Sequence, residues 1–245
     1  MITSTAVAVI IITFLATFFR SAFGFGEALV AVPLLALYLP VSVAAPLAVL
    51  LSVTVAGFVV VQDWQEIHLH SAGWLFVSTL FGLPLGLWLL TSSHQKSVKI
   101  GLGVLIMAFA LYSLLGKKPP ELKDAGVVWI ACCGFAAGIL GGAYGMNGPP
   151  LVIYGAMRRW SAQQFRATLQ GYFLPASAIG LVGYWIAGLW VPAVTRYYLV
   201  SLPAAVPAIF LGKRVNRSLR GVAFLRVVYV LLAAIGSVLI IQSVR

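Results

Sequence analysis

Apolar residues fall along this chain in long runs that short polar segments separate. An α-helix needs about 20 apolar residues to cross the hydrocarbon core of a membrane, since each residue advances about 1.5 Å and the core is about 30 Å thick. Eight runs reach or approach this length: 2–19, 44–62, 72–90, 97–115, 126–142, 166–190, 195–211 and 222–242. Two runs, 28–39 and 149–157, are shorter. The pattern predicts an all-α integral membrane protein, a polytopic bundle of eight to ten membrane elements in a single transmembrane domain over residues 1–245.

The composition agrees with this pattern, because 62% of the residues are apolar and only 9% are charged. A soluble domain carries about 25% charged residues. A water-soluble globule is therefore excluded, and so is a disordered chain, which needs low hydrophobicity and high charge. The net charge of +11 does not indicate nucleic-acid binding, because the basic residues fall mostly in short gaps between apolar runs, as the positive-inside rule describes. We expect the lipid bilayer, and no nucleic acid, as a partner.

Each short apolar run follows a longer one, and a glycine-rich break separates the two. The first break is Arg20-Ser-Ala-Phe-Gly24-Phe-Gly26-Glu27, and the second is Gly141-Gly-Ala-Tyr144-Gly145-Met-Asn147-Gly148-Pro-Pro150. An offset of 121 residues, close to half the chain, superimposes Gly24 on Gly145, and three longer runs follow each break. This order of elements indicates an internal duplication, with halves at approximately 1–118 and 122–245 and five helical elements in each.

Two topologies are compatible with this arrangement. If each broken pair makes one discontinuous crossing, the chain has eight spans, its halves are parallel, and nine loop Lys and Arg lie inside against five outside. If all ten elements reverse direction, the halves are inverted and the count becomes eleven against four. The inverted arrangement agrees better with the positive-inside rule. However, the run 149–157 has only nine residues, which cannot span a bilayer. Both place the N-terminus outside, and the first apolar run lacks the positive region of a signal peptide, so it is expected to be retained.

Breaks in apolar helices at membrane depth require a reason, because unpaired backbone groups there cost several kcal/mol each. A break persists where it is buried or lines a cavity, and a helix that restarts there directs free N–H groups and its positive dipole end into that cavity. Pro149 and Pro150 suit the first turn of such a helix, and Asn147 just upstream could cap that turn or donate its amide to a ligand. Two such starts facing each other predict an anion site near the midplane.

A simpler interpretation is that the glycines only permit close packing of helices. The pairs Gly82/Gly86, Gly134/Gly138 and Gly141/Gly145 do have the Gly-x-x-x-Gly spacing. Two matched breaks, each with a polar residue, favour a binding cavity over packing alone.

The breaks also resemble the motifs of a known family. Gly24-Phe-Gly26-Glu27 with Pro33 in the first half, and Gly145-Met-Asn147-Gly-Pro-Pro150-Leu-Val-Ile-Tyr154 with Arg166-Ala-Thr168 in the second, look like the TauE/SafE family. The likeness covers nearly the whole chain, although Glu27 stands where a small residue is common. Members are bacterial inner-membrane permeases associated with sulfite, sulfoacetate and related organosulfur anions, often as exporters. The resemblance implies anion transport across the bacterial inner membrane. The N-terminus, which both topologies place outside, is then expected in the periplasm.

Glu27 is the only acidic residue well inside an apolar region. Ionisable residues inside a membrane are candidates for function because charge is costly there. Glu27 is therefore a candidate for proton coupling or substrate control, and the alternative is a structural pair between an acid at a helix N-terminus and Arg20. Arg20 ends a fully apolar run, so we expect it to be buried.

The remaining candidates are groups that bind oxyanions. Arg20 and Arg166 offer a planar fork of donors that never loses its charge, although Arg166 could instead be an anchor at the inner face. Tyr144, Gln170 and Tyr172 supply neutral donors, and Gln170 lies on the same helical face as Arg166. The predicted substrate-binding residues are Arg20, Gly24, Gly26, Tyr144, Asn147, Gly148, Arg166, Gln170 and Tyr172.

We predict no cofactor and no metal, because His68 and His70 are two residues apart and do not share a helix face. The expected function is a secondary transporter, working as an exporter, of small sulfur-containing oxyanions such as sulfite or sulfoacetate. A passive anion channel is an alternative, and a membrane enzyme is a weaker one, since the sequence contains no Walker loop, nucleophile elbow or HExxH motif. Small-residue faces are compatible with a homodimer and equally with packing inside one chain.

Overall fold

A computed structural model describes residues 4–244 apart from 24–25, 64–68, 93, 117–120, 123–126, 161 and 217–221; it does not place the side chains of 23, 58–63, 69–71, 162–167, 170, 213, 215–216, 222–228 and 231. This part of the chain forms ten α-helices and no strand. They are α1 (Ser4–Phe23), α2 (Glu27–Leu35), α3 (Val41–Asp63), α4 (Leu69–Ser92), α5 (Gln95–Leu114), α6 (Val127–Tyr144), α7 (Gly148–Met157), α8 (Ala162–Ile186), α9 (Pro192–Asn216) and α10 (Val222–Val244). The predicted all-α bundle is confirmed.

Five of these helices are long and apolar enough to cross a membrane: Ser4–Ala22, Ala72–Ser92, Gln95–Leu114, Val127–Tyr144 and Pro192–Gly212. Three shorter apolar segments accompany them, at Val41–Gly57, Gly171–Ile186 and Leu232–Val244. Large apolar side chains also face outward, such as Phe81, which is 70% exposed, and Trp88, which is 65% exposed. An outer surface of this kind suits lipid and not water. The chain is a multi-pass membrane protein.

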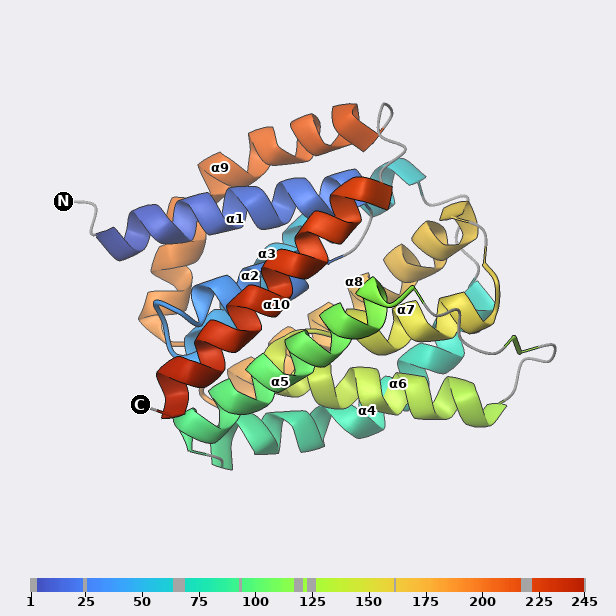
Figure 1. Cartoon of the computed structure of the whole chain (residues 1–245), viewed down its shortest axis with the longest axis horizontal. Helices are drawn as coiled ribbons and strands as arrows, with labels where there is room; N and C mark the ends of the chain where they lie inside the picture. Colours follow the sequence, from blue (N-terminus) through green and yellow to red (C-terminus); the bar gives the residue numbers. More distant parts are fainter. Residues whose placement is uncertain are drawn as a thin grey trace.

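The helices run in alternating directions between two ends of the molecule (Figure 1). Helices α3, α5, α7 and α9 end on the right in that view, where α4, α6, α8 and α10 begin, and both termini lie on the left. Helix α1 runs from left to right and α6 from right to left. This is the ten-element arrangement, in which the first helices of the two halves are antiparallel.

Helices α2 and α7 are the exceptions in length, with 9 and 10 residues. At about 1.5 Å per residue each is about 15 Å long, which is half of the hydrocarbon core. Helix α2 begins at the buried Glu27, and α7 begins at Gly148, directly before the buried Pro149 and Pro150. They are therefore half-helices that start inside the bundle.

Helices pack in pairs that cross between the two halves of the sequence. Helix α1 packs on α9, α6 packs on α4, α5 packs on α10, and α3 packs on α8. The first helix of each half thus lies against the fourth helix of the other half. This exchange places the two glycine breaks, which end α1 and α6, in the middle of the molecule.

Glycines allow α4 and α6 to approach closely. A Cβ added at Gly86 would lie 2.1 Å from the carbonyl oxygen of Ile139, and one added at Gly138 would lie 2.3 Å from that of Thr79. Contacts this short exclude any larger residue unless the helices move apart. The packing interpretation is confirmed for Gly82, Gly86, Gly134 and Gly138.

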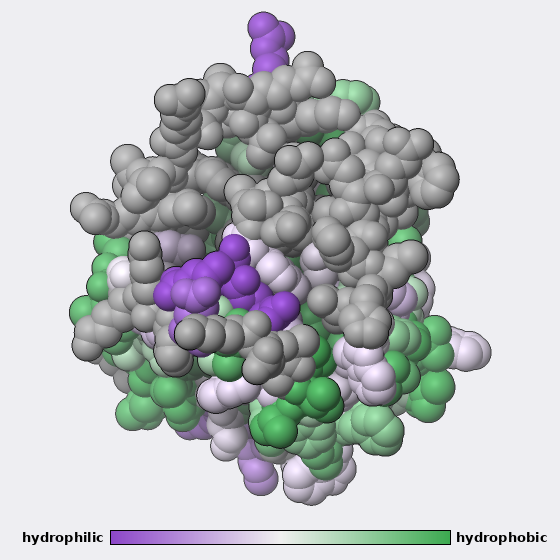
Figure 2. Space-filling view, turned by 90° about the vertical axis from the view of Figure 1, so that its right-hand side faces the viewer, coloured by the Kyte–Doolittle hydropathy of each residue, from purple (hydrophilic) through white to green (hydrophobic). Residues whose placement is uncertain are grey.

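The right-hand end of the molecule in Figure 1 faces the viewer in Figure 2. Hydrophilic surface gathers near the centre of that face and apolar surface lies around its edge. The exposed or half-buried polar residues in the described connections at this end include Glu121, Arg158 and Arg159. This distribution is the one expected where a helical bundle emerges from lipid.

Candidate functional site

The first break depends on a glycine with a backbone conformation that other residues rarely adopt. Gly26 has φ 92°, in the left-handed region, and directly precedes the first residue of α2, Glu27. A Cβ at Gly26 would also lie 2.7 Å from the ring of Phe19. Glycine is therefore required both by the backbone and by the space available.

The second break ends α6 in a similar way. Gly145 has φ 67°, its N–H donates to the carbonyl of Gly141 at 2.8 Å, and the N–H of Met146 donates to that of Leu140 at 3.1 Å. These bonds satisfy the last carbonyls of the helix, as is common at a left-handed glycine. Helix α7 then begins with prolines in its first turn, as predicted.

The two breaks line one cavity. Its volume is about 30 Å³. The residues of its wall are Arg20, Gly26, Glu27, Ala28, Leu29, Ser52, Phe109, Gly145, Met146, Asn147, Gly148, Pro149, Val152, Phe173 and Ser177. A water needs at least about 10 Å³ by this measure, so the cavity has room for one or two waters in this conformation.

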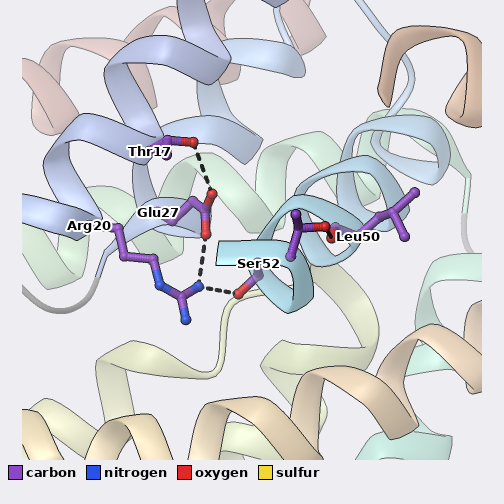
Figure 3. Close-up of polar contacts among 6 residues, drawn as sticks. Thr17, Arg20, Glu27, Leu50 and Ser52 are labelled. Carbon is purple, nitrogen blue, oxygen red and sulfur yellow. Dashed lines mark hydrogen bonds and ion pairs between the residues drawn. The ribbon is translucent and has the colours of Figure 1, made fainter. Parts of the chain in front are cut away.

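A buried ion pair forms the charged side of the cavity (Figure 3). The Nη1 atom of Arg20 lies 2.8 Å from Oε2 of Glu27, and the two side chains are 3% and 1% exposed. Thr17 on α1 donates to Oε1 of Glu27 at 3.2 Å. Nη1 of Arg20 also donates to Ser52 on α3. The pair that the sequence offered as an alternative thus exists, and the predicted burial of Arg20 is confirmed.

Among the residues that the structure describes, none accepts a hydrogen bond from the other edge of the Arg20 guanidinium. Nε and Nη2 are both buried and unbonded, and in Figure 3 the second terminal nitrogen points away from Glu27 and Ser52. These two atoms form one side of the guanidinium fork, which binds an oxyanion through two parallel hydrogen bonds. The ring of Phe173 lies close by, with its centroid 5.7 Å from Cζ of Arg20. Within the described part of the chain, this donor pair is buried at a residue of the cavity wall and is not satisfied by the protein.

Among its described residues, the second half supplies only neutral groups to the cavity. Nδ2 of Asn147 donates to the hydroxyl of Tyr172 at 3.3 Å, and that hydroxyl lies 2.7 Å from Oγ1 of Thr79. Thr79 in turn donates to the carbonyls of Leu75 and Gly134, both at 2.9 Å. Asn147 stands at the N-cap position of α7 but makes no side-chain cap bond. Its amide is therefore held by Tyr172 at the cavity wall.

Backbone donors differ between the two half-helices. The first N–H groups of a helix have no intrahelical partner. Helix α2 offers those of Glu27, Ala28 and Leu29, whereas Pro149 and Pro150 remove two donors from the first turn of α7. The N-terminus of α2 therefore offers more free N–H donors than the N-terminus of α7. Arg20 lies on the same side of the cavity as the N-terminus of α2.

The predicted site residues divide into three groups. Arg20, Gly26, Glu27, Asn147 and Gly148 line the cavity, and Tyr172 lies behind Asn147. Tyr144 is buried, but its hydroxyl lies against Gly101 on α5 and it is not part of the cavity wall. Gly24 and the side chains of Arg166 and Gln170 lie outside the described residues.

The same limit applies to His68 and to the side chain of His70. Among the residues that are described, no three His, Cys, Asp or Glu side chains group as metal ligands would.

Four residues around the site were missed from the sequence: Thr17, Ser52, Phe173 and Ser177. Ser52 and Ser177 are small polar residues inside apolar runs, which is a weak signal. The offset of 121 residues that relates the breaks also relates Ser52 to Phe173. The place of Ser52 beside Arg20 is known only from the structure, so this offset could not have led to Phe173 from the sequence alone.

A multi-pass helical bundle with two half-helices that start at a common buried cavity defines the class of membrane transporters with broken helices. Comparison with known proteins gives the family. The family model described as "Sulfite exporter TauE/SafE" matches residues 9–239, so the chain belongs to the TauE/SafE family. It is a membrane transporter and not an enzyme.

One curated relative is named "Probable sulfite/organosulfonate exporter TauE" and comes from Cupriavidus necator. It is 25% identical to this chain over 182 residues, which cover 74% of the chain and 70% of the relative. No solved structure matches the chain.

Proposed function

We propose that this chain is a secondary transporter that exports small sulfur-containing oxyanions, such as sulfite or sulfoacetate, across the bacterial inner membrane. The observation that carries the proposal is the Nε–Nη2 edge of Arg20, which is buried without a partner at the cavity where both half-helices begin. The family and the name of the Cupriavidus necator relative support a sulfur-containing anion over other anions.

In the proposed complex, two oxygens of the sulfonate or sulfite group accept hydrogen bonds from Nε and Nη2 of Arg20. The free N–H groups at the start of α2 face the same wall and stabilise negative charge through the helix dipole. The amide of Asn147 and the hydroxyl of Ser177 supply neutral contacts, and Phe109, Met146 and Phe173 contact the carbon part of an organic substrate.

The small size of the cavity supports a carrier over a passive channel. At about 30 Å³ the cavity is small in this conformation, so a carrier whose helices move to admit an organic sulfonate fits better than a permanently open pore. We propose alternating access, in which one bundle rocks against the other around the two half-helix starts. Flux into proteoliposomes that neither saturates nor supports countertransport would favour a channel instead.

The orientation follows from the basic segments of the sequence. The helix ends that flank Lys117/Lys118/Lys123, Arg158/Arg159/Arg166 and Lys213–Arg220 lie at one end of the molecule. The positive-inside rule makes this end cytoplasmic and both termini periplasmic. An inside-negative potential then favours export, by about 2.3 kcal/mol per charge for each 100 mV.

Coupling of transport to a proton at Glu27 stays a prediction. Arg20 is the only other charged side chain among the described residues that line the cavity, and the groups packed beside Glu27, Thr17 and Ser52, do not titrate. An unchanged pH profile of transport in Glu27→Gln would eliminate this coupling.

The function is tested by thermal unfolding of the purified protein with sulfite, sulfoacetate, taurine, sulfate and neutral controls. We expect the sulfur oxyanions to raise the unfolding midpoint, because a ligand that binds only the folded state stabilises it. In Asn147→Ala the shift should fall, since the amide at the cavity wall is lost. The proposal fails if no anion raises the midpoint of the wild-type protein.

A further inference from the structure

The ion pair of Arg20 and Glu27 places a carboxylate inside a cavity that is proposed to bind anions. Glu27 occupies the Nη1 side of the guanidinium, while the Nε–Nη2 edge beside it has no partner. The two charges cancel, so the empty cavity has no net charge from its described side chains. A site that only had to attract an anion would be stronger without a carboxylate 2.8 Å from its cation.

In the proposed transport cycle, the carboxylate of Glu27 has a role in the step that returns the empty carrier. A carrier that performs net export must return empty, with its binding site still in a low-dielectric environment. A lone guanidinium there is costly, because its charge has lost water and has no partner. A carrier with unpaired Arg20 would therefore return slowly unless a new anion accompanied it.

We propose that Glu27 is a resident counter-anion that neutralises Arg20 in the empty carrier and so permits the empty return step. This inference rests on the transport function proposed above. Thr17 and Ser52 hold the pair in place, since one donates to Glu27 and the other accepts from Arg20. The pair and the two hydroxyl groups that hold it all come from the first half of the chain, from α1, α2 and α3.

The geometry also allows Glu27 to stay in place when the substrate binds. The substrate uses Nε and Nη2, and Glu27 uses Nη1, so neither displaces the other. The loaded cavity then carries the charge of the substrate alone.

The test compares two modes of flux in proteoliposomes, using labelled methanesulfonate as the probe. Exchange, with the anion on both sides, needs only the loaded carrier to cross, whereas net efflux also needs the empty return. In Glu27→Gln we expect net efflux to fall about tenfold or more and exchange not to fall, because the empty carrier then carries an unpaired buried charge while the loaded carrier is neutral. The matched control is Glu121→Gln, which removes an exposed acid and should leave both rates unchanged.

Equal losses in the two modes would overturn the inference, since they would indicate that Glu27 only holds the structure together. Retention of both rates would overturn it as well. If Glu27→Gln does not purify as a folded protein, Glu27→Ala decides the question, because it also removes the carboxylate: a net-to-exchange ratio below that of the wild type supports the inference, and an equal ratio contradicts it. Absence of any methanesulfonate or sulfite flux in the wild type would instead defeat the proposed transport function.

Discussion

At the scale of single residues, the site is built around the two edges of one guanidinium. Nη1 of Arg20 is held by Glu27 and Ser52, while Nε and Nη2 are buried without partners. Lysine has the same charge but only a single ammonium group, which cannot hold a carboxylate on one side and a two-point oxyanion contact on another. The shape of the arginine side chain matters here as much as its charge.

We therefore expect Arg20→Lys to weaken binding of methanesulfonate about tenfold or more, which corresponds to about 1.4 kcal/mol or more. Binding is measured by titration calorimetry in detergent. The matched control is Arg159→Lys, because Arg159 is exposed at the end of the molecule and lies 3.7 Å from the exposed Glu121. Equal affinities for the Arg20→Lys and wild-type proteins would contradict the two-edge arrangement.

The same residues show which parts of the site could be predicted from the sequence. Arg20, Glu27 and Asn147 were accessible because polar residues beside glycine breaks in apolar runs are rare. The contact between Arg20 and Glu27 was not, because the helical spacing stops at the break and the left-handed turn at Gly26 sets the distance. Ser52 joins the pair only through the packing of α3, which no local pattern encodes. Tyr144 lies near the second break in sequence, yet its position at the end of α6 directs its hydroxyl toward α5.

At the scale of helices, the lengths of apolar runs predicted the elements well because length is a local property. The helix against which each helix packs was harder to predict, because α1 packs on α9 and α4 packs on α6, across the two halves of the sequence. The glycines at Gly-x-x-x-Gly spacing indicated that some helices pack closely without indicating which ones. Only the structure shows that Gly82 and Gly86 face Phe135 and Ile139.

Two glycines on α4 give a direct test of this packing. Gly86→Ala places a Cβ 2.1 Å from the carbonyl oxygen of Ile139, so we expect a loss of about 1–3 kcal/mol in the free energy of unfolding. Gly73→Ala on the same helix meets no atom within 4 Å and should leave stability unchanged or raise it slightly, by about 0.5 kcal/mol, since alanine favours a helix. Both are measured by reversible denaturation in detergent. Equal stability of the two variants would contradict the close approach of α4 and α6.

At the scale of the whole molecule, the ten helices alternate in direction and both termini lie at one end (Figure 1). The sequence left an eight-span parallel arrangement and a ten-element inverted arrangement open, because charge favoured one and the length of the short runs favoured the other. The structure reconciles the two considerations. Helices α2 and α7 reverse direction without crossing the full membrane, since each starts at the buried cavity.

This arrangement predicts which residues are accessible from each side of the membrane. In a background with Cys132→Ala and Cys133→Ala, a cysteine at the exposed Ser92 should react with a membrane-impermeant maleimide added to intact cells, after the outer membrane is made permeable. A cysteine at the exposed Glu121 should react only after the inner membrane is opened. Reaction of both positions from the same side would contradict the alternating topology.

The division of the cavity wall between charged and neutral groups has a consequence for how such proteins diversify. Both ionic residues come from α1 and α2, whereas Met146, Val152 and Phe173 belong to the second break, α7 and α8. Substitutions at these three positions alter the space for the carbon portion of a guest while the ionic partners stay in place. The proposed site therefore predicts that single changes in the later half of the chain alter which organic ligand is bound, without rebuilding the part that recognises the oxyanion.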